Sequence, residues 1–78
     1  MPRDEDTQAL WRAGVLVYRR AMARHRDKEW LCHAAAVGAV MQMRPDMGWE
    51  EASGIVIEAI AAISARWPEW MWKGVGEE

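Results

Sequence analysis

Apolar residues in this 78-residue chain recur every three or four positions, and proline and glycine interrupt the pattern at few places. Spacings of three and four place side chains on one face of an α-helix, whereas a half-buried strand alternates apolar and polar residues. No segment alternates for long enough to suggest a strand. The interruptions divide the chain into three main helices and a tail. We therefore predict an all-α protein, a compact three-helix bundle forming one domain over residues 1–78, with room for one more short helical turn at the C-terminal end.

The first helix is predicted over about residues 7–26. Acidic residues precede it, where they can cap its N-terminus and oppose the positive end of the helix dipole. Its core face follows the spacing 4, 3, 4, 3 and consists of Trp11, Val15, Tyr18, Met22 and His25.

Residues 24–29, RHRDKE, are six polar residues in a row, which a helix with one apolar face does not need. We expect the chain to turn here, with Asp27 capping the second helix; one continuous long helix is the competing interpretation. The second helix, about 28–43, is apolar around most of its circumference, which is typical of a buried helix, and we expect it to be central. It should end near Arg44, because the residue before Pro45 disfavours helical backbone.

The segment RPDMGWEEA signals the end of one helix and the start of the next. Either Asp46 or Gly48 can cap the third helix, predicted over about 49–66, and the helix dipole favours the acidic pair in its first turn. Its apolar stripe is Ala52, Val56, Ala59, Ile60, Ile63 and Trp67. Because Pro68 lacks a backbone donor and interrupts this helix, Trp67 is predicted to be the last core residue of the stripe.

A chain of this length buries only about 60% of the surface that its unfolded form exposes, so it needs dense packing or reinforcement. Its only cysteine, Cys32, excludes an internal disulfide, which leaves helix packing and self-association. The longest nearly apolar stretch, 30–43, is shorter than the roughly 20 residues that cross a bilayer. We therefore expect no membrane segment and, from the acidic N-terminus and the single cysteine, a cytoplasmic protein.

The residue types that carry catalysis are few and poorly placed. Cys32 and His33 are adjacent on a predicted helix and point about 100° apart, so they cannot pair directly. A set of His25, His33 and a nearby carboxylate lacks the spacing of a recognisable metal site. Glu50 and Glu51 have an ordinary helix-capping explanation. Without a phosphate loop or other catalytic motif, we predict no enzyme activity, no catalytic residue, no metal and no cofactor.

Six of the ten basic residues lie between positions 12 and 28: Arg12, Arg19, Arg20, Arg24, Arg26 and Lys28. A basic helical face can contact phosphates, so a nucleic-acid-binding accessory or regulatory protein is the alternative functional hypothesis. The third helix, however, carries three glutamates that would repel DNA, and the net charge of −2 gives no general attraction for nucleic acid or anionic membrane. Direct reading of a DNA groove is therefore not favoured.

The segment WPEWMW, residues 67–72, holds three of the six tryptophans in a chain without phenylalanine. Tryptophan and arginine are enriched where protein surfaces bury one another. One or two of these rings can fold over the core, but three rings crowded behind a proline exceed what one small domain covers. The aromatic tail, residues 67–73, therefore predicts a homo-oligomer contact or a site for another protein; a purely internal lid is the alternative.

Together these features predict a non-enzymatic protein-binding module that forms a homodimer. The expected partner-binding residues are Arg12, Arg19, Arg20, Arg24, Trp70 and Trp72. A small helical chain without catalytic residues is the kind of protein that phages and mobile elements use to block a host machine by occupancy, as anti-CRISPR inhibitors do. This inhibitor role is the leading hypothesis, with a host or self protein as the partner.

Overall fold

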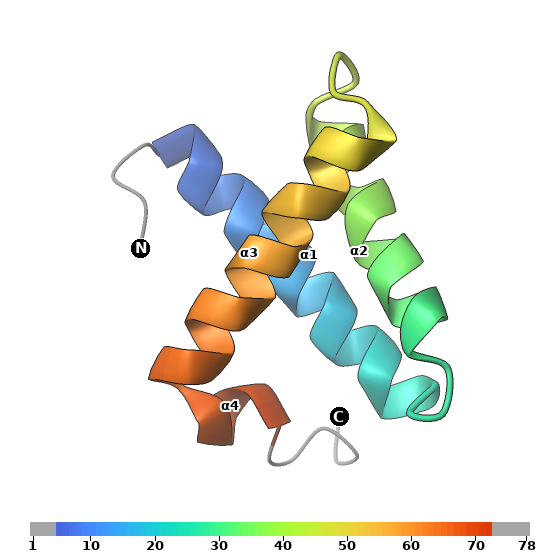
Figure 1. Cartoon of the computed structure of the whole chain (residues 1–78), viewed down its shortest axis with the longest axis vertical. Coiled ribbons are helices and arrows are strands. Elements are labelled where there is room, and N and C mark those ends of the chain that lie inside the picture. Colours follow the sequence, from blue (N-terminus) through green and yellow to red (C-terminus); the bar gives the residue numbers. More distant parts are fainter. Residues whose placement is uncertain (1–4, 73–78) are drawn as a thin grey trace.

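The computed structural model describes residues 5–72, and of Trp72 the backbone only. These residues form α1 (Glu5–Arg24), α2 (Glu29–Met43), α3 (Trp49–Arg66) and a short α4 (Pro68–Trp72). In Figure 1, α1 and α3 cross, α2 lies beside them, and α4 turns back at the C-terminal end of α3. The prediction of an all-α, three-helix architecture with a short additional turn is confirmed for the described part of the chain.

The polar segment between the first two helices forms the expected turn. α1 ends at Arg24 and α2 begins at Glu29, so the break is present and the continuous helix is not. His25 lies outside α1 and is exposed, so its placement in the core stripe was wrong. The capping prediction was also wrong, because Lys28 rather than Asp27 is the N-cap of α2, without a side-chain hydrogen bond.

In the turn between α2 and α3, Gly48 rather than Asp46 caps the third helix, which is one of the two predicted arrangements. This residue is the N-cap of α3, and its carbonyl accepts a 3.0 Å hydrogen bond from the amide of Ala52. Met47 and Ala52 flank the cap in sequence and are both buried, the arrangement of a hydrophobic staple. Asp46 instead pairs with Arg44 at 3.2 Å on the surface. The observed span of α3 therefore matches the predicted one.

The core between the helices is built largely from small side chains. Its buried members are Leu10, Trp11, Gly14, Val15 and Tyr18 of α1, Cys32, Ala36, Val37 and Val40 of α2, Ala52, Val56, Ala59 and Ile63 of α3, and Met47 and Met71. A Cβ atom added to Gly14 would lie 3.4 Å from the Cγ2 atoms of both Val40 and Val56. Gly14 therefore lets the backbone of α1 approach both other helices closely.

The second helix is less enclosed than its composition predicts. α2 packs against α1 and α3, but Trp30 and Ala35, on different sides of the helix, are exposed. Its expected central position was therefore wrong: α2 flanks the crossing of α1 and α3 (Figure 1).

At the C-terminal end of α3 the core is closed by a side chain of the short helix α4, and not by Trp67 as predicted. Trp67 is the C-cap of α3, with φ −132° and ψ 65°, so its side chain leaves the apolar stripe and is 43% exposed. The prediction of Trp67 as core was wrong. Pro68 starts a new helix, a position at which its missing N–H costs nothing. One turn later Met71 points into the core and is completely buried.

Tyr18 links the first two helices by donating a hydrogen bond from its hydroxyl to Oε1 of Glu29 at 3.2 Å. Burial, followed by the charge and the hydrogen bond of Glu29, raises the pKa of Tyr18 from 10.0 to about 12. The folded protein therefore keeps this proton at a pH where the unfolded chain loses it.

This difference predicts an alkaline loss of stability. Because the folded-state pKa is raised, the contribution of Tyr18 is complete below about pH 10 and is lost as the pH rises toward about 12. Tyr18→Phe should lower the free energy of unfolding near pH 8, because the hydrogen bond is lost. Between pH 10 and 12, however, the free energy of unfolding of the variant should fall less steeply than that of the wild type. Urea unfolding followed by circular dichroism at each pH measures both slopes. Equal slopes for wild type and variant would contradict the assignment.

None of the helices in the described part of the chain combines the length and the apolar character that a bilayer crossing requires.

Candidate functional site

The large aromatic side chains lie mostly on the outside of the fold. Among the five tryptophans whose side chains are described, only Trp11 is buried. Trp30, Trp49, Trp67 and Trp70 are 69%, 51%, 43% and 42% exposed. Contiguous exposed apolar patches are found at interaction sites, so the surfaces that carry these rings are candidate binding sites. The rings lie on two separate surfaces.

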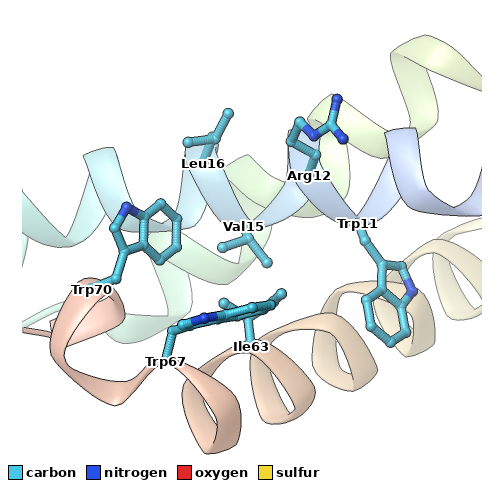
Figure 2. A pocket seen from close by; sticks show the side chains of 7 residues that line it. All are labelled: Trp11, Arg12, Val15, Leu16, Ile63, Trp67 and Trp70. Atoms are coloured by element: carbon cyan, nitrogen blue, oxygen red, sulfur yellow. The ribbon is translucent and has the colours of Figure 1, made fainter. Parts of the chain in front are cut away.

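The first surface is an open groove between α1 and the C-terminal end of α3 with α4. Its volume is about 490 Å³, and it is lined by Trp11, Arg12, Val15, Leu16, Ile63, Trp67 and Trp70. We call it the tryptophan groove. Figure 2 shows Trp70 at the α4 end and Trp11 at the opposite end, with Val15 pointing toward Trp67 and Ile63. Arg12 is the one charged side chain in this apolar lining.

Two further arginines stack on the rings of the tryptophan groove. The guanidinium of Arg19 lies 4.8 Å from the ring centre of Trp70, and its Nε donates a 2.9 Å hydrogen bond to the Trp70 carbonyl. The guanidinium of Arg66 lies 5.1 Å from the ring centre of Trp67. These contacts orient both rings, and with Arg12 they place positive charge beside an apolar surface. One exposed carboxylate, Glu69, lies on α4 between the two rings in sequence.

The second surface lies across α2 and α3 and includes Trp30, His33, Trp49 and Ile57; we call it the α2–α3 face. Trp30, His33 and Ile57 line a shallow depression of about 420 Å³ together with Ile60 and the Tyr18–Glu29 pair. The ring of Trp49 meets that of His33 edge-on, with centres 6.5 Å apart. Ile57 is 58% exposed, so the face is apolar and open to solvent.

A contact between His33 and Ser53 joins α2 to α3 and was not anticipated from the sequence. Nε2 of His33 lies 2.7 Å from Oγ of Ser53. A serine nucleophile also needs free N–H donors for an oxyanion, but Ser53 lies within α3, where the backbone amides are used by the helix. The contact links α2 to α3 at the α2–α3 face, of which His33 is a part.

The other candidate chemical groups stay apart in the fold. Cys32 is completely buried, its Sγ donates to the His25 carbonyl at 3.6 Å, and burial raises the pKa of its thiol. Glu50 and Glu51 lie exposed in the first turn of α3, where the helix dipole favours acidic side chains. Within residues 5–72, no group of three or more His, Cys, Asp or Glu side chains could hold a metal ion.

The predicted partner-binding residues divide between two places. Arg12, Arg19 and Trp70 come together at the tryptophan groove. Arg20 and Arg24 instead line a different depression, of about 480 Å³, with His25 and Leu31 among its other residues. The side chain of Trp72 lies outside the described part of the structure.

Comparison with known proteins found no matching family model, no similar curated protein and no similar solved structure. The fold and its surfaces define a small all-α domain that keeps an apolar core of small residues and presents two tryptophan-bearing surfaces to solvent.

Proposed function

We propose that this chain is a non-enzymatic protein-binding module whose tryptophan groove binds an acidic, amphipathic helix of another protein. The observation that carries the proposal is the apolar groove with arginines at its edge: Arg12 in the lining, Arg19 on Trp70 and Arg66 on Trp67. A groove between helices is a common docking place for the apolar face of a partner helix.

The chemistry of the groove favours a helix over a small polar molecule. Its floor offers side chains such as Val15 and Ile63, which match apolar residues at helical spacing, and contains no set of converging polar groups. The arginines stand at the edges, where a carboxylate on the polar side of a bound helix can reach them. Stacked arginines and exposed tryptophans are also the residues that contribute most to protein interfaces.

The experiment uses a matched pair of variants, because the chain carries exposed tryptophans on both surfaces. Tagged protein is used to recover a partner from an extract of its source cells. Trp67→Ala, inside the tryptophan groove, is expected to lower the affinity for that partner by about 30-fold or more. Trp49→Ala, similarly exposed but on the α2–α3 face, should leave it unchanged. Calorimetric titration of the purified partner gives both dissociation constants.

The charge of the partner segment is tested directly with two synthetic amphipathic helices that share the same apolar residues. One has glutamates on its polar face and the other has lysines. The acidic helix should bind more tightly, and Arg12→Glu should remove its advantage. Equal binding of both helices would contradict the charge argument while leaving protein binding itself standing.

Recovery with tagged protein also tests the alternative hypothesis, that the chain binds nucleic acid. Arg19 is engaged by Trp70, so a phosphate-binding role falls to Arg20 and Arg24, which are exposed. If nucleic acid is recovered in place of protein, and Arg20→Ala with Arg24→Ala removes it while Trp67→Ala does not, the proposal is wrong and the alternative holds.

The inhibitor hypothesis is the finer part of this proposal. A module that covers a helix of a host protein blocks whatever that helix normally contacts, without any chemical step. An activity assay of the recovered partner should then show inhibition at a one-to-one ratio of the chain to the partner site. A partner whose activity is unchanged would remove the inhibitor role.

A further inference from the structure

We infer that the depression between α1 and α2 binds a small amphiphilic anion, that is, a phosphate or carboxylate group carried on an aliphatic chain. This α1–α2 depression has a volume of about 480 Å³ and includes Arg20 and Arg24 in its lining. It shares no residue with the tryptophan groove, so the inference does not depend on the partner proposed for that groove.

Two helices and the turn between them build the α1–α2 depression. α1 contributes four residues whose spacing of three and four places them on one side of the helix: Val17, Arg20, Ala21 and Arg24. α2 contributes Leu31 and Ala35, one turn apart, and His25 lies in the connecting turn. The C-terminal end of α1 and the first turns of α2 lie side by side in Figure 1. The hollow between them has the size of a site for a small organic ligand.

The two arginines of the depression are exposed and unengaged. Within residues 5–72, no ion pair, hydrogen bond or ring contact involves the guanidinium of Arg20 or of Arg24. Arg19, by contrast, stacks on Trp70 and donates a hydrogen bond to its carbonyl. Like charges one turn apart on a helix repel each other. An anion between Arg20 and Arg24 offsets this repulsion and accepts charge-assisted hydrogen bonds from both.

No carboxylate lines the α1–α2 depression to neutralise these arginines. The nearest acidic residues in sequence are Asp27 and Glu29. Glu29 lines the depression of the α2–α3 face instead, where it accepts the hydrogen bond from Tyr18. Asp27 is exposed in the turn and stands in sequence between two other cations, Arg26 and Lys28. The positive charge at the depression is therefore available to a ligand.

The remaining lining is apolar, and this determines what kind of anion fits. Val17, Ala21 and Leu31 are half-buried, and Ala35 is exposed beside them. Inorganic phosphate has no apolar part to cover these side chains, and neither has the phosphate backbone of a nucleic acid. The net charge of −2 also gives the protein no general attraction for a polyanion. An anionic head group on the arginines with an aliphatic chain over the apolar side chains satisfies both parts of the lining.

Calorimetric titration of the full chain with octyl phosphate and with octanoate, each below its micelle concentration, tests the inference. We expect one-to-one binding, and the tighter of the two anions identifies the preferred head group. Inorganic phosphate keeps the charge without the chain, and octanol keeps the chain without the charge. Each should bind at least about tenfold more weakly than octyl phosphate, because each uses only one part of the lining.

A matched pair of double variants locates the site. Arg20→Gln with Arg24→Gln should weaken the binding of octyl phosphate by about tenfold or more. Arg26→Gln with Lys28→Gln removes the same charge from neighbouring residues that do not line the depression, and should change the affinity by less than about threefold. Circular dichroism verifies that both variants keep their helix content.

A second variant tests the apolar side of the depression without removing an arginine. Ala35→Glu places a carboxylate in the lining, where it repels the head group and competes for the arginines, so it should also weaken binding. Ala61→Glu, at an exposed position of α3 outside the depression, is its control and should leave the affinity unchanged.

Four results would overturn the inference. The first is that octyl phosphate does not bind below its micelle concentration, even if the protein sediments with vesicles that contain phosphatidylglycerol, since a membrane surface is then the ligand. The second is that inorganic phosphate binds as tightly as octyl phosphate. The third is that Trp67→Ala removes binding while the Arg20 and Arg24 double variant keeps it, which would place the ligand in the tryptophan groove. The fourth is that an oligonucleotide binds through Arg20 and Arg24 and octyl phosphate does not displace it.

Discussion

Met71→Ala is expected to destabilise the protein by about 2–5 kcal/mol, although Met71 lies in a helix of only five residues near the end of the chain. Met71 is completely buried and is among the largest fully buried side chains. Its removal leaves a cavity below α3 and releases the contact that holds α4 on the core. The free energy of unfolding measured in urea should fall by this amount, and the melting temperature should fall with it.

Met43→Ala is the matched control for this prediction. Met43 ends α2 and is 47% exposed, so its replacement should change the free energy of unfolding by less than about 0.5 kcal/mol. Met71→Leu, which conserves most of the volume, should recover most of the loss. Equal effects of Met71→Ala and Met43→Ala would show that α4 does not close the core.

Gly14→Leu should also be strongly destabilising, with a loss of about 3 kcal/mol. Any Cβ at this position already touches Val40 and Val56 at 3.4 Å, so a larger side chain must push α1 away from two helices at once. Gly14→Ala adds only that one atom and gains about 1 kcal/mol of helix propensity. We therefore expect the alanine variant to lie within about 1 kcal/mol of wild type.

Gly54 supplies the control for the glycine series, because it lies in α3 and a Cβ there meets nothing within 4 Å. Gly54→Leu should be neutral or stabilising in urea unfolding, since it gains helix propensity without a clash. If Gly14→Leu were tolerated as well as Gly54→Leu, the close approach of the three helices at Gly14 would be contradicted.

The helices were predictable from the sequence because local signals decide their ends. The polar run at 24–29 and the turn before Gly48 separate three apolar patterns, and these signals act within a few residues. The capping of α2 was less predictable, because Asp27 is the favoured capping residue by type but the geometry of the turn places Lys28 at the N-cap.

Which side chains of the aromatic tail are buried could not be predicted from local sequence signals. Trp67 continues the apolar spacing of α3, but the backbone leaves the helix at this residue and Pro68 restarts it in a new direction. Which ring then faces solvent depends on the angle between α3 and α4. That angle is set by the packing of Met71, a contact with residues distant in the sequence.

The site was predictable only in part, for a similar reason. Tryptophans crowded into one segment attract notice, whereas Trp49 meets His33, three residues after Trp30, only once α2 and α3 fold side by side. The division of the arginines between two depressions could have been predicted from their spacing. Arg12 and Arg19 lie two turns apart on one side of α1. Arg20 and Arg24 lie one turn apart on another side.

The placement of the rings outside the core also gives the protein a built-in optical signal. Indole emits at longer wavelength in water than in an apolar environment, and four described tryptophans are substantially exposed. Covering the groove should shift the emission of Trp67 and Trp70 to shorter wavelength, and covering the α2–α3 face should do the same for Trp30 and Trp49. Single Trp→Phe variants then assign each shift to one surface, so binding at the two surfaces can be followed separately in unlabelled protein.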